Sequence, residues 1–129
     1  MDSSAIVKLI VDEVESPELL EMIDSTDAVL TTSFISEIEC VRAASRISKD
    51  LREIAKERLQ SFVILPLTES IRARSMSIKP GALRGLDAIQ LATAIEIEES
   101  LHGFVSYDEK LNDAARDSGL SVITPGWID

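Results

Sequence analysis

Short apolar runs alternate with longer segments of helical periodicity along this chain of 129 residues. Apolar residues at three-to-four spacing predict helices, and short runs rich in β-branched residues predict strands. The predicted helices are 4–13, 16–25, 34–48, 49–61, 68–78, 86–100 and 108–118. The predicted strands are 28–31, 62–65, 103–106 and 121–124, and Gly119 is the expected C-cap of the last helix.

This alternation predicts the fold class. Strands that alternate with helices, and that are too far apart for tight hairpins, indicate a parallel sheet. We therefore expect a single α/β domain over residues 1–129, with helices on both faces of a mainly parallel sheet in a three-layer arrangement. In such folds the functional residues lie beyond the carboxyl ends of the strands.

Composition and charge narrow the setting. A lone cysteine, Cys40, excludes an internal disulfide and a Cys-rich zinc site, and no segment approaches the length of a membrane span. We therefore expect a cytoplasmic protein with no membrane partner. The net charge is −10, but residues 1–39 account for −9 of it. Residues 70–86 contain no acid, so an anionic partner is compatible with the charge, although solvated helix surface is the ordinary interpretation.

Four acidic residues fall near the expected functional edge. Asp2 directly precedes the first helix, Asp108 follows the strand 103–106, Asp87 lies in the first turn of the helix 86–100, and Glu39 flanks an apolar stripe. Each also has an ordinary structural interpretation. Asp2 and Asp108 suit N-caps, Asp87 suits a helix dipole, and Glu39 suits an exposed helix position.

Four segments, in order, carry a family resemblance. They are Asp-Ser-Ser-Ala-Ile-Val-Lys-Leu at 2–9, Glu-Cys-Val-Arg-Ala at 39–43, Leu-Arg-Gly-Leu-Asp-Ala-Ile-Gln-Leu-Ala-Thr-Ala at 83–94, and Phe-Val-Ser-Tyr-Asp-Glu-Lys-Leu at 104–111. Together they resemble the motifs of PIN domains. The length of the chain and the sequence of residues 83–94 most resemble those of the VapC toxins of bacterial toxin–antitoxin pairs.

The resemblance implies an acidic active site. It makes Asp2, Glu39, Asp87 and Asp108 the catalytic residues, of which Asp2, Asp87 and Asp108 bind metal, and it assigns Ser4 and Ser106 to supporting hydrogen bonds. Gathered carboxylates repel one another, and a hard cation such as Mg²⁺ relieves that repulsion. The implied reaction is hydrolysis of RNA with Mg²⁺, for which Mn²⁺ can substitute.

The resemblance also implies partners. These are the RNA substrate, a VapB-type antitoxin and a second copy of the chain in a homodimer. Cations that lie near the acids in sequence are the candidates for contacts with RNA phosphates: Arg42, Arg72, Arg74, Lys79 and Arg84.

Two departures from the family pattern, and two alternative functions, are open. A PIN domain has an apolar strand before the first Asp, but only Met1 precedes Asp2, so we expect a truncated first strand and a poorly anchored Asp2. Gln90 stands where His is frequent in the family.

The alternative functions are a phospho-acceptor receiver domain and a PIN-like module that binds RNA or protein without cutting. A receiver lacks support because residues 66–68, directly after the strand 62–65, contain no Asp, and because no Lys follows residue 110.

Overall fold

The computed structural model describes residues 1–127 of the chain. The helices are α1 (Ser3–Ile10), α2 (Ser16–Asp24), α3 (Phe34–Ile47), α4 (Lys49–Leu59), α5 (Glu69–Ser75), α6 (Gly85–Glu96), the 3₁₀ helix η1 (Glu98–Ser100) and α7 (Glu109–Asp117). The strands are β1 (Thr31–Ser33), β2 (Val63–Leu65), β3 (Phe104–Val105) and β4 (Val122–Ile123). Among these residues, no helix is long and apolar enough to cross a membrane.

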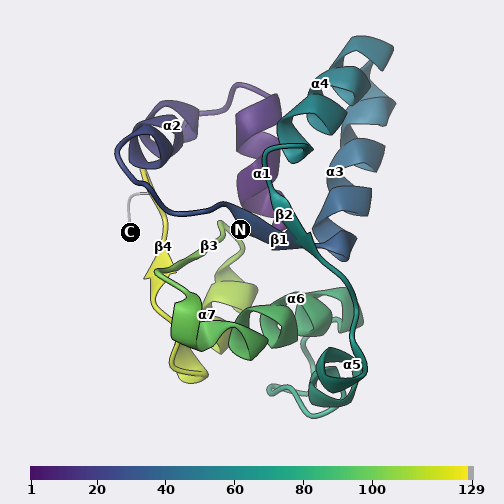
Figure 1. The fold of residues 1–129 in the computed structure, drawn as a ribbon, viewed down its shortest axis with the longest axis vertical. Coiled ribbons are helices and arrows are strands. Elements are labelled where there is room, and N and C mark those ends of the chain that lie inside the picture. The colour runs from purple at the N-terminus through teal and green to yellow at the C-terminus, as the bar shows by residue number, and fades with distance from the viewer. Residues whose placement is uncertain (128–129) are drawn as a thin grey trace.

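The strands lie between two groups of helices (Figure 1), α1–α4 on one side and α5–α7 on the other. Each side has its own apolar core. One contains Ile6 of α1 and Leu19 of α2, and the other contains Leu91 of α6 and Leu111 of α7. Helix α7 shows why: its apolar residues recur at three-to-four spacing and face the core, while its charged residues face solvent. The predicted three-layer α/β fold is confirmed.

All strand pairs are parallel, but they form two separate two-stranded sheets, which corrects the expectation of one sheet. β1 pairs with β2, and β3 pairs with β4. Met1 and Asp2 lie between them. The Met1 amino group donates to the carbonyl of Thr31 (2.9 Å), and the Asp2 amide donates to the carbonyl of Val105 (3.1 Å). These two residues therefore bridge β1 and β3, and no strand precedes Asp2 among the described residues, as the sequence predicts.

The first two residues are held firmly, so the expectation that Asp2 is poorly anchored is wrong. The Met1 carbonyl accepts hydrogen bonds from the Thr32 hydroxyl (2.6 Å) and the Gln90 amide (3.2 Å). Burial lowers the pKa of the Met1 amino group to about 6, although the nearby charge of Asp2 acts in the opposite direction. Asp2 itself is only 5% exposed. Contacts on both sides of the bridge thus replace the stability that a longer strand supplies.

Several predicted boundaries move. The strand predicted at 28–31 is wrong, because Val29 is 72% exposed and β1 starts only at Thr31, opposite Val63. The helix predicted over 68–78 shortens to α5, with Thr68 as its N-cap. The helix predicted over 86–100 ends at Glu96 and is followed by η1. Gly119 follows α7 with φ at +88°, which is the left-handed conformation expected after a helix end.

Candidate active site

Asp2 is the N-cap of α1 and is buried beside β3. Its Oδ1 accepts hydrogen bonds from the Ser4 hydroxyl (2.6 Å) and the Ala5 amide (3.2 Å), and its Oδ2 accepts one from the Ser106 hydroxyl (3.0 Å). Burial raises the pKa of Asp2, and these hydrogen bonds partly oppose that rise because they favour the charged carboxylate. A cation close to Asp2 would therefore stabilise its ionised form.

Ser106 connects Asp2 to Asp108. Its hydroxyl oxygen accepts from the backbone amide of Asp108 (3.2 Å) while its proton goes to Asp2. Asp108 is the N-cap of α7, and its Oδ1 accepts from the Leu111 amide (3.0 Å). The hydroxyl oxygen of Ser4 also accepts from the Tyr107 amide (2.8 Å). Just beyond the carboxyl end of β3, Ser106 thus connects the carboxylate of Asp2 to the backbone of Asp108, and Ser4 connects it to the neighbouring Tyr107.

Glu39 reaches the same end of α1 from α3. Its Oε1 accepts a hydrogen bond from the hydroxyl of Ser3 (3.1 Å), the residue that follows Asp2. The thiol of Cys40 lies buried nearby. Burial, followed by the negative charges of Glu39 and Asp2, raises the pKa of Cys40 to about 12. The thiol therefore stays protonated, and the hydrogen bond from Ser3 is the contact that places Glu39 near Asp2.

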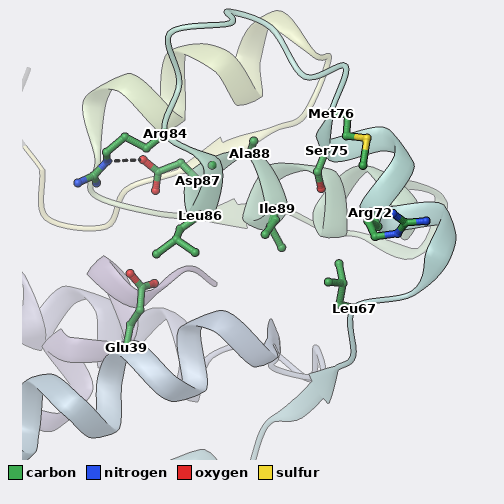
Figure 2. A pocket seen from close by; sticks show the side chains of 11 residues that line it. Glu39, Leu67, Arg72, Ser75, Met76, Arg84, Leu86, Asp87, Ala88 and Ile89 are labelled. Atoms are coloured by element: carbon green, nitrogen blue, oxygen red, sulfur yellow. Dashed lines mark hydrogen bonds and ion pairs between the residues drawn. The ribbon is translucent and has the colours of Figure 1, made fainter.

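Asp87 lies in the first turn of α6, where Arg84 faces it. The Arg84 Nε donates to Asp87 Oδ2 (3.2 Å), and the two side chains are 80% and 20% exposed. Figure 2 shows Glu39 and Asp87 on opposite walls of one pocket, with Leu86 between them. An ion pair with so exposed an arginine is weak, so Asp87 is open to exchange its partner.

This pocket, which we call the α6 pocket, has a volume of about 630 Å³. It lies between α3, the β2–α5 connection, α5 and the start of α6. Figure 2 shows acidic side chains at one end, aliphatic side chains in the middle and Arg72 at the other end. Its lining residues are Glu39, Leu67, Arg72, Ser75, Met76, Arg84, Gly85, Leu86, Asp87, Ala88 and Ile89.

Comparison with known proteins identifies the family. The model of the PIN domain matches residues 1–117. The chain belongs to the PIN domain family. It is 35% identical to ribonuclease VapC47 of Mycobacterium tuberculosis (strain CDC 1551 / Oshkosh), over 99% of this chain and 97% of that protein. It is also 34% identical to ribonuclease VapC46 of Mycobacterium tuberculosis (strain ATCC 25618 / H37Rv), over 97% of this chain and 95% of that protein.

A solved structure agrees with this PIN fold. A toxin–antitoxin complex from Klebsiella pneumoniae matches with a TM-score of 0.75 over 96% of this chain and 94% of that chain, at 22% identity. The family resemblance read from the sequence is therefore confirmed, together with the α/β fold class. The receiver-domain alternative is wrong, because the family that matches is a different one.

The acids of this PIN domain suit a hard cation by their chemistry. All four candidates offer carboxylate oxygens, which Mg²⁺ prefers as ligands. Within residues 1–127, however, no three His, Cys, Asp or Glu side chains are arranged as a ready metal cage. Mg²⁺ does not require one, since it keeps several waters and is often held by one or two carboxylates with substrate phosphates. The residues present therefore fit an ion that is completed by water and by an anionic substrate.

The five candidate RNA-contacting cations do not lie together. Arg72 and Arg84 line the α6 pocket. Arg74 instead pairs with Glu96 (3.3 Å) and lines a groove beside β1 and β3, and Arg42 lines another groove between α3, α4 and β2. Lys79 is exposed in the α5–α6 connection. Only Arg72 and Arg84 are thus placed with Glu39 and Asp87.

Gln90 connects the elements that carry the candidate site residues, a role that the sequence did not predict for it. It lies on α6 one turn after Asp87 and is buried. Its Nε2 donates to the Ser36 hydroxyl (2.7 Å) and to the Met1 carbonyl (3.2 Å), and its Oε1 accepts from the Ser33 hydroxyl. Gln90 therefore ties the helix that carries Asp87 to the start of α3 and to the residue before Asp2. The available signal was its place in the third motif, residues 83–94, three residues after Asp87.

Proposed function

We propose that this PIN domain is a metal-dependent endoribonuclease of the VapC type. The observation that carries the proposal is the linkage of four acids from four distant segments. Ser106 bonds the carboxylate of Asp2 and the backbone amide of Asp108, Glu39 bonds the residue next to Asp2, and Glu39 shares the α6 pocket with Asp87. The relatives at 34% and 35% identity, which bear the name ribonuclease VapC, support the same activity.

In this proposal Asp2, Asp87 and Asp108 hold Mg²⁺, or Mn²⁺ in its place. The bound ion supplies an acidified water and neutralises the charge that develops on the phosphate. Asp2 contributes a carboxylate whose orientation Ser4 and Ser106 fix in advance, and such fixed ligands are worth about 10–100-fold in metal affinity. Glu39 or Asp108 orients the attacking water or accepts its proton.

The reaction is hydrolysis of a phosphodiester. Water attacks phosphorus, the bond from phosphorus to the 3′ oxygen breaks, and a proton goes to that oxygen. The products are a 5′ phosphate and a 3′ hydroxyl, without a covalent enzyme intermediate. Arg84 and Arg72 lie at either end of the α6 pocket, where their charges suit the RNA backbone. Displacement of Arg84 from Asp87 would free both groups, one for phosphate and one for metal.

We also propose a toxin–antitoxin role, in which a small VapB-type antitoxin inhibits the enzyme and two copies form a homodimer. The complex from Klebsiella pneumoniae, which has the same fold, supports an antitoxin partner. An arginine from an antitoxin would suit the pocket acids, because its planar guanidinium matches a carboxylate. Arg84 already makes such a contact with Asp87 within this chain.

Cleavage of RNA with added Mg²⁺ or Mn²⁺ tests the nuclease. We expect wild-type activity that stops on addition of EDTA, and a loss of at least about a hundredfold in Asp87→Asn. The matched control is Asp113→Asn, since Asp113 is an exposed acid on α7 that pairs with Arg116. That variant should keep full activity. Cleavage that survives both EDTA and Asp87→Asn contradicts the mechanism, and RNA binding without any cleavage favours the non-catalytic PIN module.

A further inference from the structure

The middle of the α6 pocket has no role in metal binding. It is lined by Leu67, Met76, Leu86 and Ile89, which come from the β2–α5 connection, the end of α5 and the face of α6. Leu86 and Met76 are 50% and 74% exposed. Aliphatic side chains that line a concave pocket beside a few polar groups are the usual lining of a small-ligand site. The acids account for one part of a ligand, and these side chains call for a second, apolar part.

An RNA nucleotide combines these two parts. Its phosphate is anionic, whereas the faces of its base are apolar enough to stack and to bury against side chains. A base within a duplex keeps its faces covered by its neighbours, so only an unpaired base can enter such a pocket. The volume of about 630 Å³ lies within the range of about 300–1,000 Å³ that is usual for pockets that hold small ligands.

We propose that the aliphatic middle of the α6 pocket binds one unpaired nucleobase of the RNA, next to the phosphodiester that the acids cut. This inference rests on the proposed nuclease function and adds to it a residue set that selects the substrate. Leu86 is central to it, because Figure 2 shows its side chain between Glu39 and Asp87, at the boundary of the acidic and aliphatic parts. A base packed against Leu86 would fix the position of its own phosphate near the acids.

The charges at the two ends of the pocket suit this occupant. Arg84 lies at the acidic end and Arg72 at the opposite end, so a nucleotide in the middle has a cation on either side for the phosphates that flank it. The Nη2 atom of Arg72 lies 4.0 Å from Oε1 of Glu69. Because both side chains are exposed, this ion pair holds Arg72 only weakly. An apolar segment of an antitoxin or of a second copy would use the aliphatic walls but has no need of two flanking cations.

Binding of short RNAs tests the inference separately from cleavage. A labelled single-stranded RNA hexamer is compared with an abasic ribose–phosphate chain of equal length and charge, using wild type and Leu86→Ala. We expect Leu86→Ala to weaken binding of the intact RNA about tenfold and to leave binding of the abasic chain unchanged. Ile47→Ala is the matched control, because Ile47 is an exposed aliphatic residue at the far end of α3 that lies outside the α6 pocket. It should bind both RNAs as wild type does.

Salt separates the apolar contact from the charged one. The defect of Leu86→Ala should persist at high salt, whereas the defect of Arg72→Ser should shrink as wild-type binding itself loses its electrostatic part. Equal weakening of intact and abasic RNA by Leu86→Ala overturns the inference, as does an abasic chain that binds wild type as tightly as intact RNA. Unchanged RNA binding with loss of self-association, measured by sedimentation, overturns it in favour of a second copy.

The two proposals fail in different ways. Base-dependent binding that Leu86→Ala removes, with no cleavage under any divalent ion, upholds the base site and overturns the nuclease. Metal-dependent cleavage with no dependence of binding on the base upholds the nuclease and overturns the base site.

Discussion

The two pairs of acids in this PIN domain are held in different ways. Asp2 and Asp108, the serine-held pair, cap two helices and share the hydroxyl of Ser106. Glu39 and Asp87, the pocket pair, line open space, and Asp87 bonds an arginine that is itself almost fully in solvent. The first pair is part of the fold, because its carboxylates satisfy helix ends. The second pair is available to a ligand.

The difference has an energetic side. Asp2 is buried, and its raised pKa means that the folded protein resists its ionisation, which three hydrogen bonds only partly offset. A buried negative charge at this position lowers the stability of the folded protein. A role of Asp2 in binding a cation explains why the charge is there. The side chain of Asp87 is 20% exposed and faces the Arg84 guanidinium, so it is both less buried than Asp2 and paired with a cation. Substitutions in the two pairs should therefore have similar effects on activity and different effects on stability.

The largest expected effect comes from Asp2→Asn. Asparagine keeps the N-cap but removes the buried charge, so cleavage should fall at least about a hundredfold while the melting temperature in EDTA at neutral pH rises. Ionisation of Asp2 lowers the free energy of unfolding, and this destabilisation grows as the pH rises through the raised pKa of Asp2 in the folded protein. It disappears below the usual pKa of an aspartate, where the carboxyl is protonated in both the folded and the unfolded states. The stability gain of Asp2→Asn, measured by thermal unfolding, should accordingly shrink in acid.

Asp87→Asn is the comparison for that experiment. It should lose activity to a similar degree without a gain in melting temperature. A lower melting temperature of Asp2→Asn at neutral pH would show that the ionised carboxylate stabilises the fold. The distinction between the two pairs would then fail.

A smaller effect is expected from Gln90→Leu, which breaks the link between the pairs. The hydroxyls of Ser33 and Ser36 lose a buried partner, so the free energy of unfolding should fall by about 1–3 kcal/mol in urea. Because α6 also loses its bond to the Met1 carbonyl, the Mg²⁺ concentration for half-maximal cleavage should rise. Gln90→His, which keeps a donor and an acceptor, should restore part of both. Lost stability with an unchanged Mg²⁺ requirement would limit Gln90 to packing.

The smallest effect is expected from Arg84→Ala, at the exposed side of the pocket pair. Its ion pair with Asp87 is worth little, so stability should stay within about 0.5 kcal/mol of wild type. RNA affinity should fall, and the slope of its salt dependence should decrease by about one. Arg116→Ala, which breaks a similar exposed pair on α7, is the control and should change neither. An unaltered salt slope in Arg84→Ala would exclude Arg84 from phosphate contact.

The serine-held pair was the more predictable part of the site. Asp2 and Asp108 each stand immediately before a helical pattern, so their capping positions are local features of the sequence. Both interpretations offered for them, cap and site residue, are compatible, since both carboxylates cap helices while Ser106 bonds the carboxylate of Asp2 and the backbone amide of Asp108. The placement of Asp87 opposite Glu39 depends instead on how α6 packs on α3, which no local pattern encodes.

The parts that were not predictable depend on contacts between distant residues. The run 28–31 is apolar enough for a buried strand, but Val29 stays exposed because pairing with β2 begins further along. Within the part of the chain that the structure describes, the sheet is split because no strand lies between β1 and β3, and only Met1 and Asp2 connect them, each by one bond from its nitrogen to a strand carbonyl. Arg74 lies only two residues from Arg72, but it pairs with Glu96 and lines a different groove.

The bridge between the two sheets has a practical consequence. The amino group of Met1 is buried against the carbonyl of Thr31, one residue away from a carboxylate that the proposed chemistry needs. In this chain, a tag attached ahead of Met1 would change the bond from its nitrogen to Thr31 and so the surroundings of Asp2. Recombinant protein for assays should therefore carry its purification tag at the C-terminus. Weak activity of a protein with an N-terminal tag would be an effect of the tag.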